Sequence, residues 1–194
     1  MKSYLISIII LLSLTNVLQA QHINLGIKGG LNVSTIEGDN SGSYKTKPGF
    51  YLGLLGHIHL TDQFAIQPEA YYSVQGTQYK SGSSDLKLNL NYVNIPLLFQ
   101  YMFDNGFRLQ AGPQVGILVS ANSVVSDSDT EVKSSYKNTD VALVAGMSYV
   151  KPSTGFGFDI RYNHGLSNIN ASDAVNSYNR GFQVGVFYLF QHRS

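Results

Sequence analysis

An all-β fold, an eight-stranded antiparallel up-and-down transmembrane β-barrel preceded by a cleaved signal peptide, is predicted by two features of the sequence. Eight stretches carry apolar residues at every second position, the spacing of a strand with one apolar face. The seven connections between them alternate long, short, long, short, long, short, long. In membrane barrels the turns on the side of the chain ends are short and the loops on the outer face are longer.

The first twenty residues are expected to be removed before the barrel folds. Lys2 supplies a positive start, residues 4–18 are almost all apolar, and the segment ends in the small residue Ala20. This is the layout of a secretory signal peptide cleaved after Ala20. An uncleaved membrane anchor is the alternative, but the apolar run is short for one. Residues 21–194 then form a single outer-membrane β-barrel domain.

The composition favours strands and excludes several other classes. The chain has 19 glycines, 13 tyrosines and 10 phenylalanines but no tryptophan, which suits an all-β protein. It has no cysteine, so neither disulfides nor lipid attachment through an N-terminal cysteine can form. The net charge of +1, with no Lys/Arg-rich block, gives no reason to expect nucleic-acid binding.

The strands are predicted in order from their own alternation. They cover residues 23–36, 48–60, 64–80, 88–103, 107–121, 141–150, 155–166 and 180–191. Most exceed the roughly 9–11 residues that a tilted membrane strand needs. In the first strand one face carries Ile23, Leu25, Ile27, Leu31 and Val33; in the second it carries Phe50, Leu52, Leu54, Ile58 and Leu60. The apolar face of the fifth strand carries Phe107, Leu109, Ala111, Val115, Ile117 and Val119, and that of the eighth carries Phe182, Val184, Val186, Tyr188 and Phe190.

The connections divide into two sets. The short ones are residues 61–63, 104–106 and 151–154; the long ones are residues 37–47, 81–87, 122–140 and 167–179. Aromatic residues on the apolar face gather beside the short turns, as in the interfacial girdle of a membrane barrel. They are Phe64, Tyr101, Phe103, Phe107, Tyr149, Phe156, Tyr188 and Phe190. A soluble barrel with its apolar face inward is the alternative.

The opposite face of the strands is polar and is predicted to line a closed lumen. It holds every charged residue found away from the strand ends, which predicts an internal ion network of Lys28, Glu69, Arg108, Asp159 and Arg161. Facing lipid, each would cost about 2–4 kcal/mol at the bilayer midplane. Small residues on the same face leave room for long side chains in a narrow barrel. These are Gly26, Gly30, Gly53, Gly112, Gly116, Gly146, Gly157 and Gly185.

Three prolines fall inside predicted strands. Pro68, Pro96 and Pro113 cannot donate a backbone hydrogen bond to a neighbouring strand. They are therefore predicted to lie at β-bulges.

Five segments carry a family resemblance. They read NLGIKGGLNVS (24–34), FAIQPEAYYSVQG (64–76), LNYVNIPLLFQY (90–101), RLQAGPQVG (108–116) and NRGFQVGVFYLF (179–190). With these, the chain resembles the outer-membrane β-barrel family of Bacteroidetes-type bacteria that includes PorT-like proteins. The resemblance implies an eight-stranded barrel inserted in the Gram-negative outer membrane by the barrel-assembly machinery. Some relatives take part in a secretion system, but the family supplies no catalytic or binding residues to carry over.

The chain end departs from the family pattern. Outer-membrane barrels commonly finish on an aromatic residue that is recognised during assembly, whereas here Phe190 is followed by four further residues. Two explanations stay open: the machinery reads Phe190 internally, or insertion is less efficient than usual.

Three sets of residues could be drawn as chemical sites. His57 and His59 share a strand face with Glu69 as a diagonal neighbour, which could be part of a metal site. Asp127, Asp129 and Glu131 alternate as in a calcium loop but lack its glycine. Glu69 with Asp159 could be drawn as a catalytic pair, yet ion pairing explains both carboxylates. No catalytic, cofactor-binding or metal residue is therefore assigned, no cofactor is expected, and the protein is expected not to be an enzyme.

The expected function is a structural or interaction role in the outer membrane. The resemblance adds an accessory role in a secretion or envelope system. The expected partners are outer-membrane lipid and an envelope protein reached through the long loops, with the barrel itself monomeric. The alternatives are a narrow outer-membrane channel and a lipid-modifying barrel enzyme.

Overall fold

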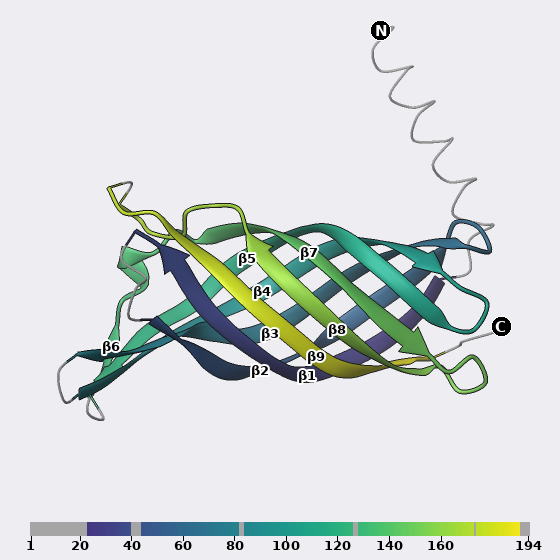
Figure 1. Cartoon of the computed structure of the whole chain (residues 1–194), viewed down its shortest axis with the longest axis horizontal. Coiled ribbons are helices and arrows are strands. Elements are labelled where there is room, and N and C mark those ends of the chain that lie inside the picture. Colours follow the sequence, from purple (N-terminus) through teal and green to yellow (C-terminus); the bar gives the residue numbers. More distant parts are fainter. Residues whose placement is uncertain (1–22, 40–43, 82–83, 126–127, 173, 191–194) are drawn as a thin grey trace, which may run out of the picture.

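The computed structural model describes residues 23–39, 44–81, 84–125, 128–172 and 174–190, which form a closed antiparallel β-barrel (Figure 1). Strand order β4-β3-β2-β1-β9-β8-β7-β5, with β4 also paired to β5, closes a ring of eight strands. The short strand β6 adds a hairpin on β5. The bounds are β1 (Ile23–Gly38), β2 (Tyr44–His59), β3 (Phe64–Ser81), β4 (Ser84–Met102), β5 (Phe107–Val125), β6 (Ser128–Glu131), the 3₁₀ helix η2 (Lys133–Ser135), β7 (Thr139–Val150), β8 (Phe156–Gly165) and β9 (Ser177–Leu189).

The predicted eight-stranded antiparallel up-and-down transmembrane barrel is confirmed. The turns β2–β3, β4–β5 and β7–β8 lie at the end where β1 begins and β9 finishes, and the long connections lie at the other end (Figure 1). We call these the short-turn end and the long-loop end. Among the described residues, no helix is long and apolar enough to cross a membrane. The predicted signal peptide and the four residues after Phe190 lie outside the described residues.

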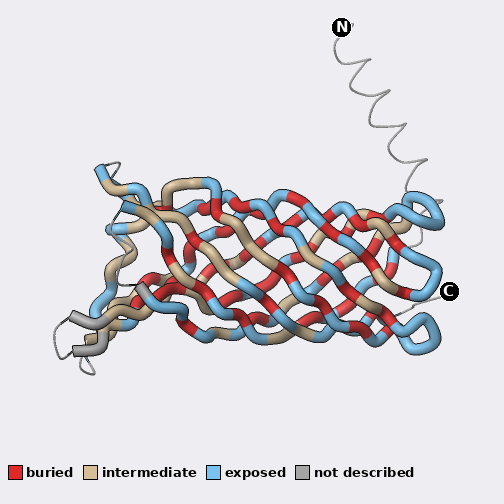
Figure 2. Tube along the Cα trace, in the orientation of Figure 1, coloured by how far each residue is buried: buried red, intermediate tan, exposed pale blue. Residues whose placement is uncertain are grey.

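Buried and exposed residues alternate along the barrel strands (Figure 2). Most of the exposed, outward residues are apolar, and many of the buried, inward ones are polar. Leu25 is 63% exposed and Leu52 is 65% exposed, whereas the inward Glu69 is 4% exposed and Arg161 is 2% exposed. An apolar outer wall of this kind suits the hydrocarbon core of a bilayer. The soluble alternative, which requires the apolar face to point inward, is therefore wrong.

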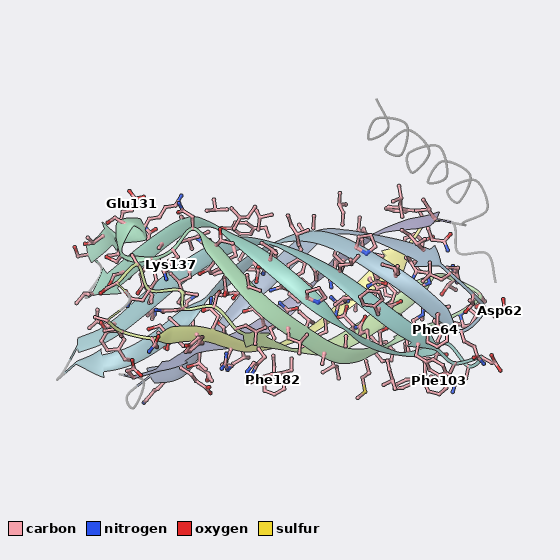
Figure 3. All side chains as sticks on the ribbon, turned by 90° about the horizontal axis from the view of Figure 1, so that it is seen from above. Asp62, Phe64, Phe103, Glu131, Lys137 and Phe182 are labelled. Atoms are coloured by element: carbon pink, nitrogen blue, oxygen red, sulfur yellow. The ribbon has the colours of Figure 1, made fainter. Side chains whose placement is uncertain are left out.

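The aromatic girdle at the short-turn end is also present. Ring centroids are 5.3 Å apart for Phe64 and Tyr101, 4.9 Å for Tyr101 and Phe103, and 5.6 Å for Phe103 and Phe107. In Figure 3, Phe64 and Phe103 lie beside the turn that carries Asp62. These amphipathic and apolar rings mark the level where the apolar wall meets the aqueous side.

The prediction of bulges at the prolines is wrong. On either side of Pro68 the β2–β3 register is unchanged, from Leu55 opposite Glu69 to Ile58 opposite Ile66. The β4–β5 register is likewise unchanged between the pair Pro96 with Gln114 and the pair Phe99 with Ala111. Pairing simply lapses for two residues beside Pro68 and Pro113, because a missing N–H removes a bond without requiring an extra residue. The register shifts fall instead between Thr46 and Tyr51 and between Asn91 and Tyr92.

Several strands run further toward the long loops than the alternation predicted. The β3–β4 hairpin stays paired up to Ser81 opposite Ser84, so the predicted loop 81–87 is mostly strand. Residues 122–140, predicted as a single long loop, contain the end of β5, all of β6, and η2. The long-loop end is thus largely built from hydrogen-bonded backbone.

Candidate functional site

The lumen holds an ion network of Lys28, Glu69, Asp159 and Arg161, all of them buried. Arg161 Nη1 lies 2.7 Å from Glu69 Oε2, and Arg161 Nη2 lies 3.0 Å from Asp159 Oδ2. Lys28 Nζ lies 2.9 Å from Glu69 Oε2 and 3.4 Å from Asp159 Oδ2. Two cations face two carboxylates, so the network is neutral, as buried charges require. Four of the five predicted members are confirmed.

Arg108 is the exception. It is buried, yet it forms no ion pair with a described carboxylate, and its Nη1 has no hydrogen-bond partner. Its position near the beginning of β5 places it toward the short-turn end, opposite Met102 and Ser148. Sequence alternation correctly put Arg108 on the inner face, but the prediction that it joins the ion network is wrong, because Arg108 lies beside the short turn between β4 and β5.

Long polar side chains surround the network. Tyr51 donates a 3.2 Å hydrogen bond to Asp159, and Gln67 donates a 2.6 Å bond to Glu69. Gln100 donates to Gln67 and to Gln110, at 3.0 and 2.8 Å. The predicted role of the inward glycines is confirmed, since a Cβ on Gly30 or Gly185 would meet the Tyr51 hydroxyl.

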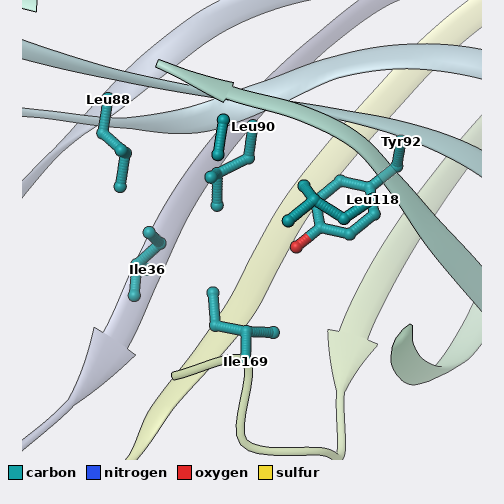
Figure 4. Close-up of a cluster of buried hydrophobic side chains, with 7 residues drawn as sticks. Ile36, Leu88, Leu90, Tyr92, Leu118 and Ile169 are labelled. Carbon is teal, nitrogen blue, oxygen red and sulfur yellow. The ribbon is translucent and has the colours of Figure 1, made fainter. Parts of the chain in front are cut away.

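Both ends of the lumen are closed by apolar side chains. Toward the short turns the base cluster consists of Leu55, Val150, Phe187 and Leu189. Toward the long loops the mouth cluster consists of Ile36, Leu88, Leu90, Tyr92, Leu118, Ala121 and Ile169 (Figure 4). Ile169 comes from the β8–β9 connection and is 0% exposed, so this connection folds back over the mouth of the barrel. Apolar, ionic and apolar layers therefore follow one another along the axis.

The histidine pair is not joined by the carboxylate that a metal site would need. His57 and His59 stack edge to face with ring centroids 4.5 Å apart. Glu69 is already engaged by Arg161, Lys28 and Gln67. Among the described residues no three His, Cys, Asp or Glu side chains are grouped as a metal site. The same engagement of Glu69 and Asp159 leaves neither carboxylate available as a general base.

The acidic stretch of the longest connection forms a strand where it is described. Asp129 and Glu131 belong to β6, which pairs with β5, and Asp129 accepts a 2.9 Å hydrogen bond from Asn122. Asp127 lies outside the described residues. A paired strand does not wrap its carboxylates around an ion as a calcium loop does.

The connections at the long-loop end are tied to one another. Lys137 N donates 2.8 Å to Ile169 O, and Ala171 N donates 3.0 Å to Ser135 O. Asn176 N donates 2.9 Å to Asp39 Oδ2. We call residues 128–138, 166–172 and 174–176 the loop rim. Many of its side chains are exposed, and Glu131 and Lys137 lie at the end of the barrel opposite Asp62 (Figure 3).

Sequence reasoning missed the mouth cluster. One signal was present: Leu88 and Leu90 fall on even positions, whereas the lipid-facing Ile95 and Leu97 fall on odd ones. Such a change of phase within one strand moves apolar side chains from the outer face to the inner face. No comparable signal marks Ile169, because it stands alone in a polar connection.

Comparisons with known proteins agree with this architecture. A family model described as an outer membrane protein beta-barrel domain matches residues 19–171. No match was found among curated proteins. Neisserial surface protein A has a similar structure, with a TM-score of 0.54, 17% identity, and coverage of 86% of this chain and 97% of that one. Ail, the attachment invasion locus protein of Yersinia pestis, has a TM-score of 0.54 and 16% identity, with coverage of 86% of this chain and 98% of that one. At these identities the likeness concerns the fold alone.

Proposed function

The chain belongs to the family of outer membrane protein beta-barrel domains, and we propose that it is a non-catalytic interaction barrel whose loop rim contacts another envelope component. It lies in the outer membrane of a Gram-negative cell. The long loops of such barrels face outward and the short turns face the periplasm. The loop rim is therefore the part available to partners outside the bilayer.

The closed lumen is the observation that carries this proposal. The ion network spans the centre, the base cluster fills the periplasmic end, and the mouth cluster fills the outer end. An eight-stranded barrel is only wide enough for its own side chains. In the part of the chain that the structure describes, these three layers of side chains support a barrel that does not conduct, and the ion pairs of Glu69 and Asp159 support a non-catalytic role. The function of this barrel is then expected to reside on its outer surfaces.

The build of the rim favours recognition. Backbone hydrogen bonds join the β5–β7 connection to the β8–β9 connection, and Ile169 anchors both to the mouth cluster. A surface that is already ordered loses less conformational entropy when a partner binds. Ail is described by its name as an attachment protein, and a contact role of that general kind is our proposal for this chain.

The sharper version is an accessory role in a secretion or envelope system. It rests on the resemblance of the strand segments to PorT-like proteins. In this role the barrel would form a stable complex with its partner rather than a transient contact. The partner is expected to be an envelope protein, and the complex is expected to contain one copy of the barrel.

Native purification tests both versions. The barrel is extracted in a mild detergent and run on native gels, beside a variant in which residues 128–131 are replaced by Gly and Ser at constant length. We expect the wild-type barrel to migrate with a partner and the variant to migrate alone. A matched control replaces residues 61–63 at the periplasmic turn in the same way and should keep the partner.

The results of this experiment distinguish a general interaction role from the accessory role. Loss of the partner with a defect in envelope export would support the accessory role. Loss of the partner with normal export would leave interaction without that role. If the wild-type barrel migrates alone and export is unchanged in every variant, the interaction proposal fails.

A further inference from the structure

The short strand β6 ends the sheet with one edge unpaired. In the strand order β6 is the last member, hydrogen-bonded to β5 on one side, and no other described strand pairs with it. It lies at the long-loop end (Figure 1), and all four of its residues, Ser128–Glu131, are exposed. An unpaired strand edge offers its backbone N–H and C=O groups to a further strand. The edge of β6 is therefore a place where another chain can add.

The register fixes which backbone groups of β6 point away from the sheet. Val132 N donates a 2.9 Å hydrogen bond to Ala121 O, and this pair continues the β5–β6 ladder. In an antiparallel ladder, hydrogen-bonded pairs alternate with pairs that exchange no bonds. Thr130 is therefore bonded to β5, whereas the N–H and C=O groups of Asp129 and Glu131 point to the open edge. Among the described residues, no backbone hydrogen bond occupies these groups.

The open edge of β6 is held in place outside the bilayer. Val132 directly follows β6 and packs against the mouth cluster. Asp129 Oδ1 accepts a 2.9 Å hydrogen bond from Asn122 Nδ2 on β5. β5 continues from the lipid-facing Val119 to Val125, and β6 pairs with that final part. An edge that is already ordered loses little conformational entropy when a strand is added to it.

The charges of β6 decide what kind of strand fits. Asp129 and Glu131 are two positions apart and therefore share one face of the sheet. Both residues are exposed, and neither forms an ion pair with a described Lys or Arg. Opposite charges directly across a strand pair stabilise it, and like charges destabilise it. A second β6 would set carboxylates against carboxylates, so the edge favours a strand with Lys or Arg at alternate positions.

We propose that the open edge of β6 binds an extended, basic peptide segment of another envelope protein, which adds to the sheet as a further strand. Backbone hydrogen bonds to Asp129 and Glu131 supply the pairing, and their carboxylates select alternate cations. This inference rests on the interaction role proposed for the loop rim and names the kind of partner. Short, charged edge strands resist unwanted pairing; here the same charges leave pairing open to a strand of opposite sign.

A synthetic peptide that alternates Lys and Thr serves as the probe. The barrel is placed in phospholipid nanodiscs, and binding of the labelled peptide is measured by fluorescence polarisation. Amide hydrogen exchange is then followed residue by residue by NMR. At saturating peptide we expect the amides of Asp129 and Glu131 to exchange about tenfold more slowly or less, and the amide of Thr130, already bonded to β5, to change little. A peptide that alternates Glu and Thr should not bind.

Two substitutions of Glu131 separate backbone pairing from charge. Glu131→Gln removes the carboxylate but keeps the N–H and should weaken binding of the basic peptide about twofold to fivefold. Glu131→Pro also removes the N–H at the open edge, without removing a bond to β5, and should weaken binding about tenfold or more. Asp62→Asn, at the opposite end of the barrel, is the charge control and should leave binding unchanged. The Thr130 amide reports whether β6 stays paired in each variant.

The results distinguish strand addition from attraction by charge alone. Equal binding by Glu131→Pro and Glu131→Gln, or binding that slows neither the Asp129 nor the Glu131 amide, overturns the proposal. If Glu131→Pro loses the pairing of β6, the exchange of these two amides in the wild-type barrel decides. Dimerisation of the barrel through this edge without peptide would also overturn it. The interaction role is tested separately: a native partner that is lost when residues 128–131 are replaced upholds that role even if the peptide does not bind.

Discussion

The guanidinium of Arg161 and the carboxylate of Glu69 meet across the full width of the barrel. Arg161 Nη1 donates 2.7 Å to Glu69 Oε2, and Nη2 donates 2.8 Å to Oε1. Their strands, β8 and β3, are four steps apart in either direction around the closed ring. This bidentate pair therefore lies on a diameter, and the chain cannot keep both an open lumen and this contact.

Glu69→Gln should destabilise the barrel strongly. It leaves Lys28 and Arg161 buried with only Asp159 to balance them, and breaking a buried pair from one side typically costs about 3–5 kcal/mol. Reversible urea unfolding in lipid vesicles measures the change in the free energy of unfolding. Glu37→Gln is the control, because Glu37 pairs with Arg180 but is 60% exposed, and surface pairs contribute about 1 kcal/mol or less. Equal effects of the two substitutions would refute the cross-lumen role.

The wild-type barrel should not conduct. Three layers of side chains lie across the axis, and a small cavity near the outer end, lined by Asn32, Asp140 and Gln183 among others, has room for only about one water molecule. Planar-bilayer recordings of the purified protein should show no discrete current steps. Reproducible steps of a single size, lost on heat denaturation, would restore the narrow channel that the sequence left as an alternative.

Gly185→Ala should destabilise the barrel through Tyr51. A Cβ at position 185 would overlap the Tyr51 hydroxyl and the backbone oxygen of Gly29. Tyr51 would have to leave Asp159, and overpacking of this kind typically costs about 1–3 kcal/mol. The same unfolding assay measures it. Gly56→Ala is the matched control, since a Cβ there meets nothing closer than 3.7 Å; similar losses in both variants would contradict the explanation.

Ile169→Ser should loosen the loop rim while leaving the membrane strands intact. It puts a hydroxyl into the mouth cluster and removes the anchor of the β8–β9 connection. Hydrogen exchange followed by mass spectrometry should show faster exchange in residues 166–172 and unchanged exchange in β1 and β2. Ala174→Ser, at an exposed position of the same connection, should behave as wild type. Unchanged exchange in both would mean that Ile169 does not hold the rim.

The barrel itself followed from local sequence pattern. Because each strand faces lipid on one side only, apolar residues recur at every second position of its sequence. The lengths of the connections distinguish the two ends of the barrel. The same pattern put Lys28, Glu69, Asp159 and Arg161 on the inner face. Which of them touch depends on the stagger between strands far apart in the chain. That stagger arises from closure of the whole ring, so the diametric pair could not be predicted locally.

The outer end departs from local pattern for a different reason. Beyond the lipid there is no apolar solvent to enforce alternation, so Leu88 and Leu90 turn inward and pack on Ile169. A small cavity beneath them is lined by residues of β1, β3, β5, β7, β8 and β9, so it depends on closure of the whole ring. The prediction of bulges at the prolines was wrong because a strand can lose a hydrogen bond without changing register.

Photo-crosslinking in living cells tests the central claim that this barrel works through its loop rim. A photo-reactive amino acid is placed at the exposed positions Ser128, Ser134 and Ser172, and at Asp62 in a periplasmic turn for comparison. We predict that the rim positions capture the same envelope component repeatedly and that Asp62 does not. Capture of nothing beyond lipid and abundant neighbours at every rim position, or capture from Asp62 alone, would contradict the account.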